Sequence, residues 1–77
     1  MEKSFRTLSI KEKLEIICEE MVEKNLLIKE ALKEFEKVYI EKALKKNKGN
    51  KKKASKSLGI HRNTLIGKIN SLKIKQR

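Results

Sequence analysis

Apolar residues recur at helical spacing through the first third of the chain. From Ile10 onwards they fall on one face of a helix, and the set is Ile10, Leu14, Ile17, Cys18, Met21 and Val22. Ser9 and Glu12 precede this face at the spacing of a capping box, in which both side chains accept hydrogen bonds from free amides at a helix start. Asn25 tolerates the left-handed conformation that ends many helices. The pattern predicts a helix over about residues 10–24, after a segment, residues 1–8, that has no clear period.

A second amphipathic segment covers about residues 28–46 and is apolar on more than one side. Its broader stripe comprises Ile28, Ala31, Leu32, Phe35, Val38, Tyr39 and Ala43. Ile40 and Leu44 lie on a different face, and a helix that is apolar on two sides must bury two sides. We expect one face to pack on the first helix and on a second copy of the chain, and the other to receive the C-terminal part. A solvent-exposed Ile40 is the alternative, since isolated exposed aliphatic residues are common.

Two short helices joined by a tight turn are predicted for the C-terminal part. Gly49 suits the left-handed position after a helix, and Asn50 suits the N-cap of a helix over about residues 51–57. Gly59 suits a tight turn before a last helix over about residues 62–72. The expected buried residues here are Ala54, Leu58, Ile60, Leu65, Ile69 and Leu72. The arrangement is typical of a helix-turn-helix, whose second helix lies in the DNA major groove.

The chain is therefore expected to be all-α, with four helices in a single domain spanning residues 1–77. Two helices over about residues 9–47 would form a dimerisation platform, and about residues 50–74 would form the helix-turn-helix. A chain this short buries only about 60–65% of the surface of its unfolded state, so disulfides, metals or oligomerisation usually supplement the core. One cysteine and one histidine supply neither an internal disulfide nor a structural zinc site, so a homodimer is expected. We expect Cys18 to be a reduced, buried apolar residue.

Charge is distributed unevenly along the chain. Residues 1–44 hold nine Lys and Arg and ten Glu, whereas residues 45–77 hold twelve Lys and Arg and no acidic residue. A mixed-charge half joined to a wholly basic half indicates a scaffold joined to a surface that binds a polyanion. A lysine-rich background composition would explain the preference for Lys but not the absence of Glu after Glu41.

The sequence also indicates where the protein acts. No apolar run approaches the ~20 residues that span a membrane, and no signal peptide is evident, so we expect a soluble, cytoplasmic protein without a membrane partner. The initial Met and the absence of a phosphate-binding Gly-x-x-x-x-Gly-Lys motif fit both a small complete protein and an excised domain.

From about Ile28 to Ile74 the chain resembles the Fis-type helix-turn-helix family, which includes Fis and the C-terminal domains of NtrC-like activators of sigma-54 promoters. The matching residues, in the expected order and spacing, are Leu32, Phe35-Glu36, Ile40, Ala43-Leu44, Gly49-Asn50, Lys53-Ala54, Leu58-Gly59-Ile60, Arg62-Asn63-Thr64-Leu65 and Lys68. The resemblance implies a homodimer in which two helices of each subunit build a four-helix core. It also implies paired recognition helices closer together than one DNA turn, so that the duplex bends and selection is loose.

The expected DNA contacts lie on the two C-terminal helices. Arg62 is expected to reach guanine O6 and N7, with a phosphate contact as its alternative. Asn63 is expected to read adenine or bind phosphate, Thr64 to bind phosphate, and His61 to lie beside phosphate, since no nucleophile or paired carboxylate near it suggests catalysis. The full predicted set is Asn50, Lys51, Lys52, Lys53, His61, Arg62, Asn63, Thr64, Lys68, Asn70 and Lys73. Lys73, Lys75 and Arg77 form a basic tail that either reaches flanking DNA or stays free. The predicted dimer interface is Leu14, Ile17, Cys18, Met21, Leu32, Phe35 and Tyr39.

Three departures from the family pattern stand out. Ser55 replaces a common alanine, His61 replaces a common serine or asparagine, and Ile66-Gly67 stand where Fis has two basic residues. The last departure weakens the expectation of Fis-like phosphate clamps on the final helix, and Gly67 costs roughly 1 kcal/mol in a helix interior.

The predicted function is sequence-tolerant binding and bending of double-stranded DNA by a homodimer, as a transcription regulator or a nucleoid protein. One alternative is the excised C-terminal domain of an NtrC-like sigma-54 activator. Another is a basic helical RNA-binding protein, which is disfavoured because the chain has only three aromatic residues, Phe5, Phe35 and Tyr39. We expect no enzymatic activity, cofactor, metal or small-molecule substrate.

Overall fold

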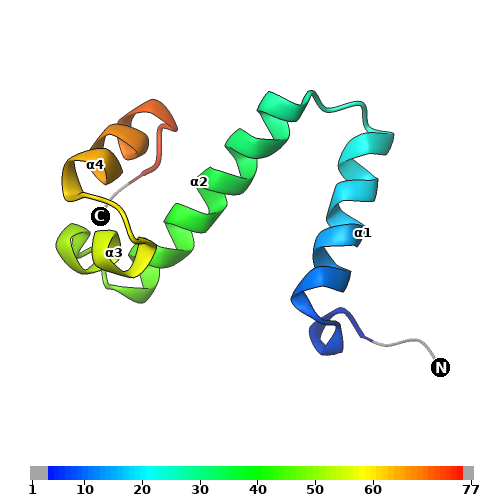
Figure 1. Ribbon diagram of the computed structural model, residues 1–77, viewed down its shortest axis with the longest axis horizontal. Helices are drawn as coiled ribbons and strands as arrows, with labels where there is room; N and C mark the ends of the chain where they lie inside the picture. The colour runs from blue at the N-terminus through cyan, green and yellow to red at the C-terminus, as the bar shows by residue number, and fades with distance from the viewer. Residues whose placement is uncertain (1–3, 76–77) are drawn as a thin grey trace. The chain divides into compact units, whose positions relative to one another are not determined.

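The computed structural model describes residues 4–75, and within them every regular element is a helix (Figure 1). The elements are a short 3-10 turn, η1 (Phe5–Thr7), and four α-helices, α1 (Ile10–Glu23), α2 (Ile28–Lys46), α3 (Lys51–Leu58) and α4 (Arg62–Ser71). The prediction of an all-α chain with four helices is confirmed, and each helix boundary lies within one residue of its expected position. The η1 turn lies in a segment for which the sequence predicts no regular structure.

The chain divides into two compact units, Met1–Ala31 and Leu32–Arg77, and the division falls within α2. It falls there, and not near residues 47–50 as the sequence suggests, because Ile40 and Leu44 of α2 are buried in one core with residues of α3 and α4. The single domain over residues 1–77 stays a prediction.

The helix starts are capped by side chains close in sequence. At α1 the Ser9 hydroxyl accepts the Glu12 N–H at 3.1 Å, and a Glu12 carboxylate oxygen accepts the Ser9 N–H at 3.0 Å. Hydrogen bonds to the Glu12 carboxylate, first from the Ser9 backbone and then from the Ser9 side chain, lower the pKa of Glu12 below its ordinary value of 4.5. Glu30 accepts the Leu27 N–H at 2.9 Å before α2, and Asn50 accepts the Lys53 N–H at 3.0 Å at α3. The predicted capping box and the Asn50 cap are confirmed.

All four α-helices end in the same way, with a residue in the left-handed conformation. In each case the next amide donates to the carbonyl five residues earlier: Leu26 to Met21, Gly49 to Leu44, Ile60 to Ser55 and Ile74 to Ile69, at 2.8–3.1 Å. The left-handed residues are Asn25 (φ 59°), Lys48 (φ 54°), Gly59 (φ 72°) and Lys73 (φ 55°).

The predictions for Asn25 and Gly59 are confirmed by these end geometries. Gly49 also has a positive φ, of 79°, as predicted, but the residue that first turns left-handed after α2 is Lys48. A side chain in this conformation costs about 1–2 kcal/mol relative to glycine, so the ends of α2 and α4 are locally strained at Lys48 and Lys73.

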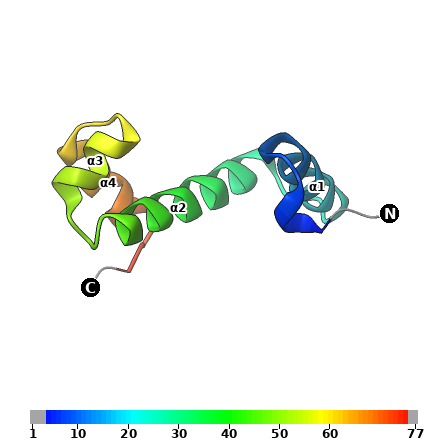
Figure 2. The same ribbon diagram turned by 90° about the horizontal axis from the view of Figure 1, so that it is seen from below.

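The unit Leu32–Arg77 has a core of its own. Its buried residues are Ile40, Leu44, Ala54, Leu65, Ile69, Leu72 and Ile74, with Leu58 and Ile60 packed against them. Figures 1 and 2 both show α3 and α4 gathered at the C-terminal end of α2. Ile40 is only 3% exposed, which excludes the alternative of a solvent-exposed Ile40 and confirms that this face of α2 receives the helix-turn-helix.

The first unit has a different character, because α1 buries none of its residues. Ile10 is 85% exposed and Val22 73%, and Cys18 is exposed as well. The expectation of a buried Cys18 is wrong for the single chain, because no described part of the chain covers that face of α1. The Lys13 ammonium lies over the Phe5 ring of η1, with its Nζ 5.6 Å from the ring centroid, in a cation–π contact.

Candidate nucleic-acid interface

The turn between α3 and α4 brings the two helices into close contact. Gly59 takes the left-handed conformation without strain and reverses the chain. Ala54 is fully buried, so the small side chain lets α3 approach α4, and Leu65 of α4 is fully buried as well. Helix α4 is thereby held along one side and exposed along the other.

The exposed side of α4 carries most of the predicted DNA contacts. Arg62, Asn63 and Thr64 lie in its first turn, and all three are exposed. Asn70 is exposed two turns later. The structure therefore places these predicted residues on one accessible helix, as a surface that enters a groove requires.

His61 is the N-cap residue of α4, but its side chain makes no cap hydrogen bond. A serine or asparagine at this position would accept one of the first amides of the helix. With His61 in place, the first-turn amides of α4 have no side-chain acceptor from the N-cap, and such amides at the positive end of a helix dipole are suited to a phosphate oxygen.

The N-terminus of α3 carries the other basic cluster. Lys52 and Lys53 are exposed and Lys51 is half-buried, while the side-chain oxygen Oδ1 of Asn50 accepts the Lys53 N–H in the helix cap. Asn50 therefore has a structural role in addition to its predicted place beside DNA. Ser55, the residue that replaces the common alanine, is buried and donates its hydroxyl to the Lys52 carbonyl at 2.8 Å, so the substitution leaves no polar group unpaired.

Lys68 differs from the other predicted contacts because it is paired within the chain. Its ammonium donates to a Glu36 carboxylate oxygen at 3.0 Å, which links α4 to α2 across 32 positions of sequence. The two side chains are 36% and 45% exposed, so the pair stabilises the fold by no more than about 1 kcal/mol. The sequence alone does not reveal this role of Glu36, because no periodic pattern connects residues so far apart.

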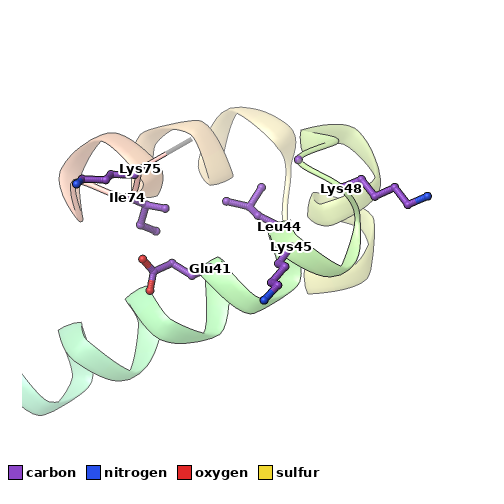
Figure 3. Close-up of a pocket in the computed structure, with 7 residues that line it drawn as sticks. Glu41, Leu44, Lys45, Lys48, Ile74 and Lys75 are labelled. Atoms are coloured by element: carbon purple, nitrogen blue, oxygen red, sulfur yellow. The ribbon is translucent and has the colours of Figure 1, made fainter. Parts of the chain in front are cut away.

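The segment after α4 returns to α2 and is not simply a free tail. Ile74 is 6% exposed, and Figure 3 shows it pointing toward Leu44 across an open pocket of about 590 Å³. Lys45, Lys48 and Lys75 also line this pocket, with Glu41 as the one carboxylate. Lys73 and Lys75 are exposed on either side of the anchored Ile74. The predicted tail residue Arg77 lies outside the described residues.

Comparison with known protein families identifies the unit. Residues 31–72, more than half of the chain, match the sequence model of the family described as bacterial regulatory protein, Fis family. The chain belongs to the Fis family. The match confirms the resemblance and makes this Fis-family chain a DNA-binding regulator whose helix-turn-helix is α3 and α4.

Comparisons with curated proteins and with solved structures find no match for this Fis-family chain. Within residues 4–75, no helix is long and apolar enough to cross a membrane. The same residues contain no cluster of three or more His, Cys, Asp or Glu side chains that could hold a metal ion.

Proposed function

We propose that this Fis-family chain works as a homodimer that binds and bends double-stranded DNA with little sequence preference, as a transcription regulator or a nucleoid protein. The observation that carries the proposal is that α1 and the first half of α2 each present an apolar face that no described part of the chain covers. Uncovered apolar helix faces in a chain that also contains a complete helix-turn-helix are what a dimeric DNA-binding protein requires.

Each of these two exposed faces is too apolar to suit a lone chain in water. On α2, Leu32 is 62% exposed, Phe35 55% and Tyr39 57%, and the two aromatic rings lie 5.6 Å apart. On α1, Leu14 is 47% and Ile17 40% exposed. Large exposed apolar patches mark interaction sites, and residues at this helical spacing are suited to pack against another helix. The predicted dimer interface is drawn from these residues, with Cys18 and Met21 beside them.

DNA binding would combine a base contact with many phosphate contacts. In this proposal Arg62 contacts a guanine edge, and the basic residues at the start of α3, with Thr64 and the amides of the first turn of α4, contact phosphates. If six to eight phosphates are neutralised, the logarithm of the binding constant should fall with a slope of about −5 to −7 against the logarithm of salt concentration.

The bending part of the proposal depends on the spacing of the two α4 helices in a dimer. Successive major grooves on one side of straight DNA lie about 34 Å apart, so recognition helices that are closer together require a bend. The same dimer would serve within a larger sigma-54 activator, since dimerisation and DNA binding are needed in both settings.

The test is a fluorescence-anisotropy titration of an AT-rich duplex of about 27 bp, longer than two helical turns, at several salt concentrations. Wild type is compared with Arg62→Ala and with Lys29→Ala, a control that removes one exposed charge from the first turn of α2. We expect tight, steeply salt-dependent binding that Arg62→Ala weakens about 10-fold or more and Lys29→Ala leaves nearly unchanged.

Two further measurements complete this test. Light scattering of the free protein should give the mass of two chains, and energy transfer between dyes at the duplex ends should rise on binding if the duplex bends. Absence of binding to any duplex at low salt would refute the DNA proposal, and a monomeric mass at micromolar concentration would refute the dimer.

A further inference from the structure

Gly67 stands in the middle of α4 without a reason in the fold. It is exposed, it does not have a positive φ, and a Cβ built on it would meet no atom within 4 Å. A glycine inside a helix is destabilising relative to alanine, because it loses more conformational freedom on folding. The chain therefore carries a cost at this position that nothing within its own structure offsets.

The position of Gly67 on α4 suggests a function that offsets this cost in stability. Asn63, Gly67 and Asn70 are spaced four and three residues apart, on the side of the helix opposite the buried Leu65 and Ile69. All three are exposed, and Ile66 lies half-buried beside them. We call these four residues, Asn63, Ile66, Gly67 and Asn70, the outward ridge of α4.

The outward ridge is uncharged, although it lies in the basic part of the chain. Its two asparagine side chains are on either side of a position that has no side chain. Asparagine pairs with adenine through N6 and N7 in the major groove, and an aliphatic side chain such as that of Ile66 suits the thymine C5-methyl group. Glycine is the residue that allows a helix backbone to approach a ligand closely.

We propose that the outward ridge of α4 reads A·T base pairs through their major-groove edges, with Gly67 providing the clearance that brings the two asparagines to the bases. This inference rests on the proposed entry of α4 into the major groove. It adds direct selection of A·T pairs to the guanine contact proposed for Arg62 and to selection by the bendability of the duplex.

The experiment separates major-groove reading from bendability. Duplexes bound by wild type are selected from a random-sequence pool, and individual A·T pairs in them are then replaced by inosine·cytosine. An inosine·cytosine pair keeps the minor-groove face of A·T, because inosine lacks the guanine 2-amino group, but it presents the major-groove face of G·C. At the pairs under α4 we expect the replacement to weaken wild-type binding by about 10-fold or more. Replacing thymine by uracil there removes one methyl group and should cost about 4-fold.

Variants test whether the outward ridge is the reader. Gly67→Leu should weaken binding to the selected duplexes and abolish the response to inosine·cytosine, and Asn70→Ala should reduce that response. Gly67→Ala should raise the melting temperature while weakening binding, which separates a DNA role from a structural one. Ser57→Leu, which also introduces a leucine at an exposed helical position but on α3, is the control and should retain the wild-type response.

The inference is overturned if wild type binds the inosine·cytosine duplexes as tightly as the originals, or if Gly67→Leu binds and discriminates as wild type does. It is also overturned if the replacement weakens wild type and Gly67→Leu equally, since another surface would then read the bases. Failure of the proposed function looks different, because wild type would then recover no duplex from the pool.

Discussion

The helix-turn-helix unit and the N-terminal helices both carry apolar residues at helical spacing, yet they differ in what those residues touch. Leu65 and Ile69 are at most 1% exposed, whereas Ile10 is 85% exposed. An amphipathic pattern therefore indicates which face of a helix must be covered, but it does not indicate whether the same chain covers that face.

Helix α2 contains both situations within its own length. Ile40 and Leu44 are buried against α3 and α4, while Phe35 and Tyr39, on another face, are more than half exposed. One side of this helix is completed by the chain itself, and the other is the side that the proposed dimer would complete.

The largest expected effect is on the stability of the core that α2 forms with α3 and α4. Leu65→Ala removes a fully buried side chain and should lower the free energy of unfolding by about 2–5 kcal/mol. The loss should be the same at all protein concentrations, because this core lies within one chain. Urea denaturation at two concentrations measures it, and a loss below about 1 kcal/mol would contradict the core described above.

The second-largest effect is expected at the exposed apolar face of α2 that contains Phe35. Phe35→Glu places a carboxylate in the apolar face of α2 and should convert the dimer to monomers. DNA affinity should then fall about 100-fold or more, because two linked binding sites become independent. Lys33→Glu, at an exposed position on the other side of α2, is the control. Light scattering and anisotropy report both changes, and a dimeric Phe35→Glu variant with wild-type affinity would count against the proposed interface.

A smaller effect is expected at the pair that joins α2 to α4. Glu36→Gln should release the Lys68 ammonium, which becomes available to a phosphate, and steepen the salt slope of DNA binding by about one unit. Glu34→Gln makes the same charge change at an exposed neighbour and serves as the control. Equal slopes for the two variants would mean that Lys68 has no phosphate within reach.

Relief of strain after α4 should produce a modest gain. Lys73→Gly places glycine at a φ of 55° and should raise the free energy of unfolding by about 0.5–1 kcal/mol. Lys75→Gly removes the same charge at a residue without a positive φ and should give no gain. Thermal denaturation of the two variants decides the matter, and equal melting temperatures would rule out the strain.

The smallest effect concerns pH at the start of α1. The folded-state pKa of Glu12 is lowered, so the cap stabilises α1 fully at pH values above 4.5, the ordinary pKa of this group. This stabilisation is lost as the pH falls through the lowered pKa. Circular dichroism between about pH 6 and about pH 3 should show a loss of helix that is reduced in Glu12→Gln. Glu15→Gln, a change in the same helix outside the cap, should behave as wild type does.

Much of the architecture could be predicted because it depends on residues close together in sequence. Ser9 with Glu12, Asn50 with Lys53, and Gly59 in its turn act through hydrogen bonds that span a few residues, and the spacing of such residues is visible in the chain. The exposure of Arg62, Asn63 and Thr64 could be predicted in the same way, since these residues begin a helix whose later apolar residues face the core.

What only the tertiary structure decided depends on contacts between distant residues. It buried Ile74 against α2, paired Glu36 with Lys68, and required Lys48 and Lys73 to take left-handed conformations that their residue type disfavours. It also left Cys18 exposed where its apolar neighbours suggested burial. Periodicity specifies the direction in which a side chain points along its own helix. Whether that side chain meets another part of the chain depends on the path of the whole backbone and on the packing of every other side chain.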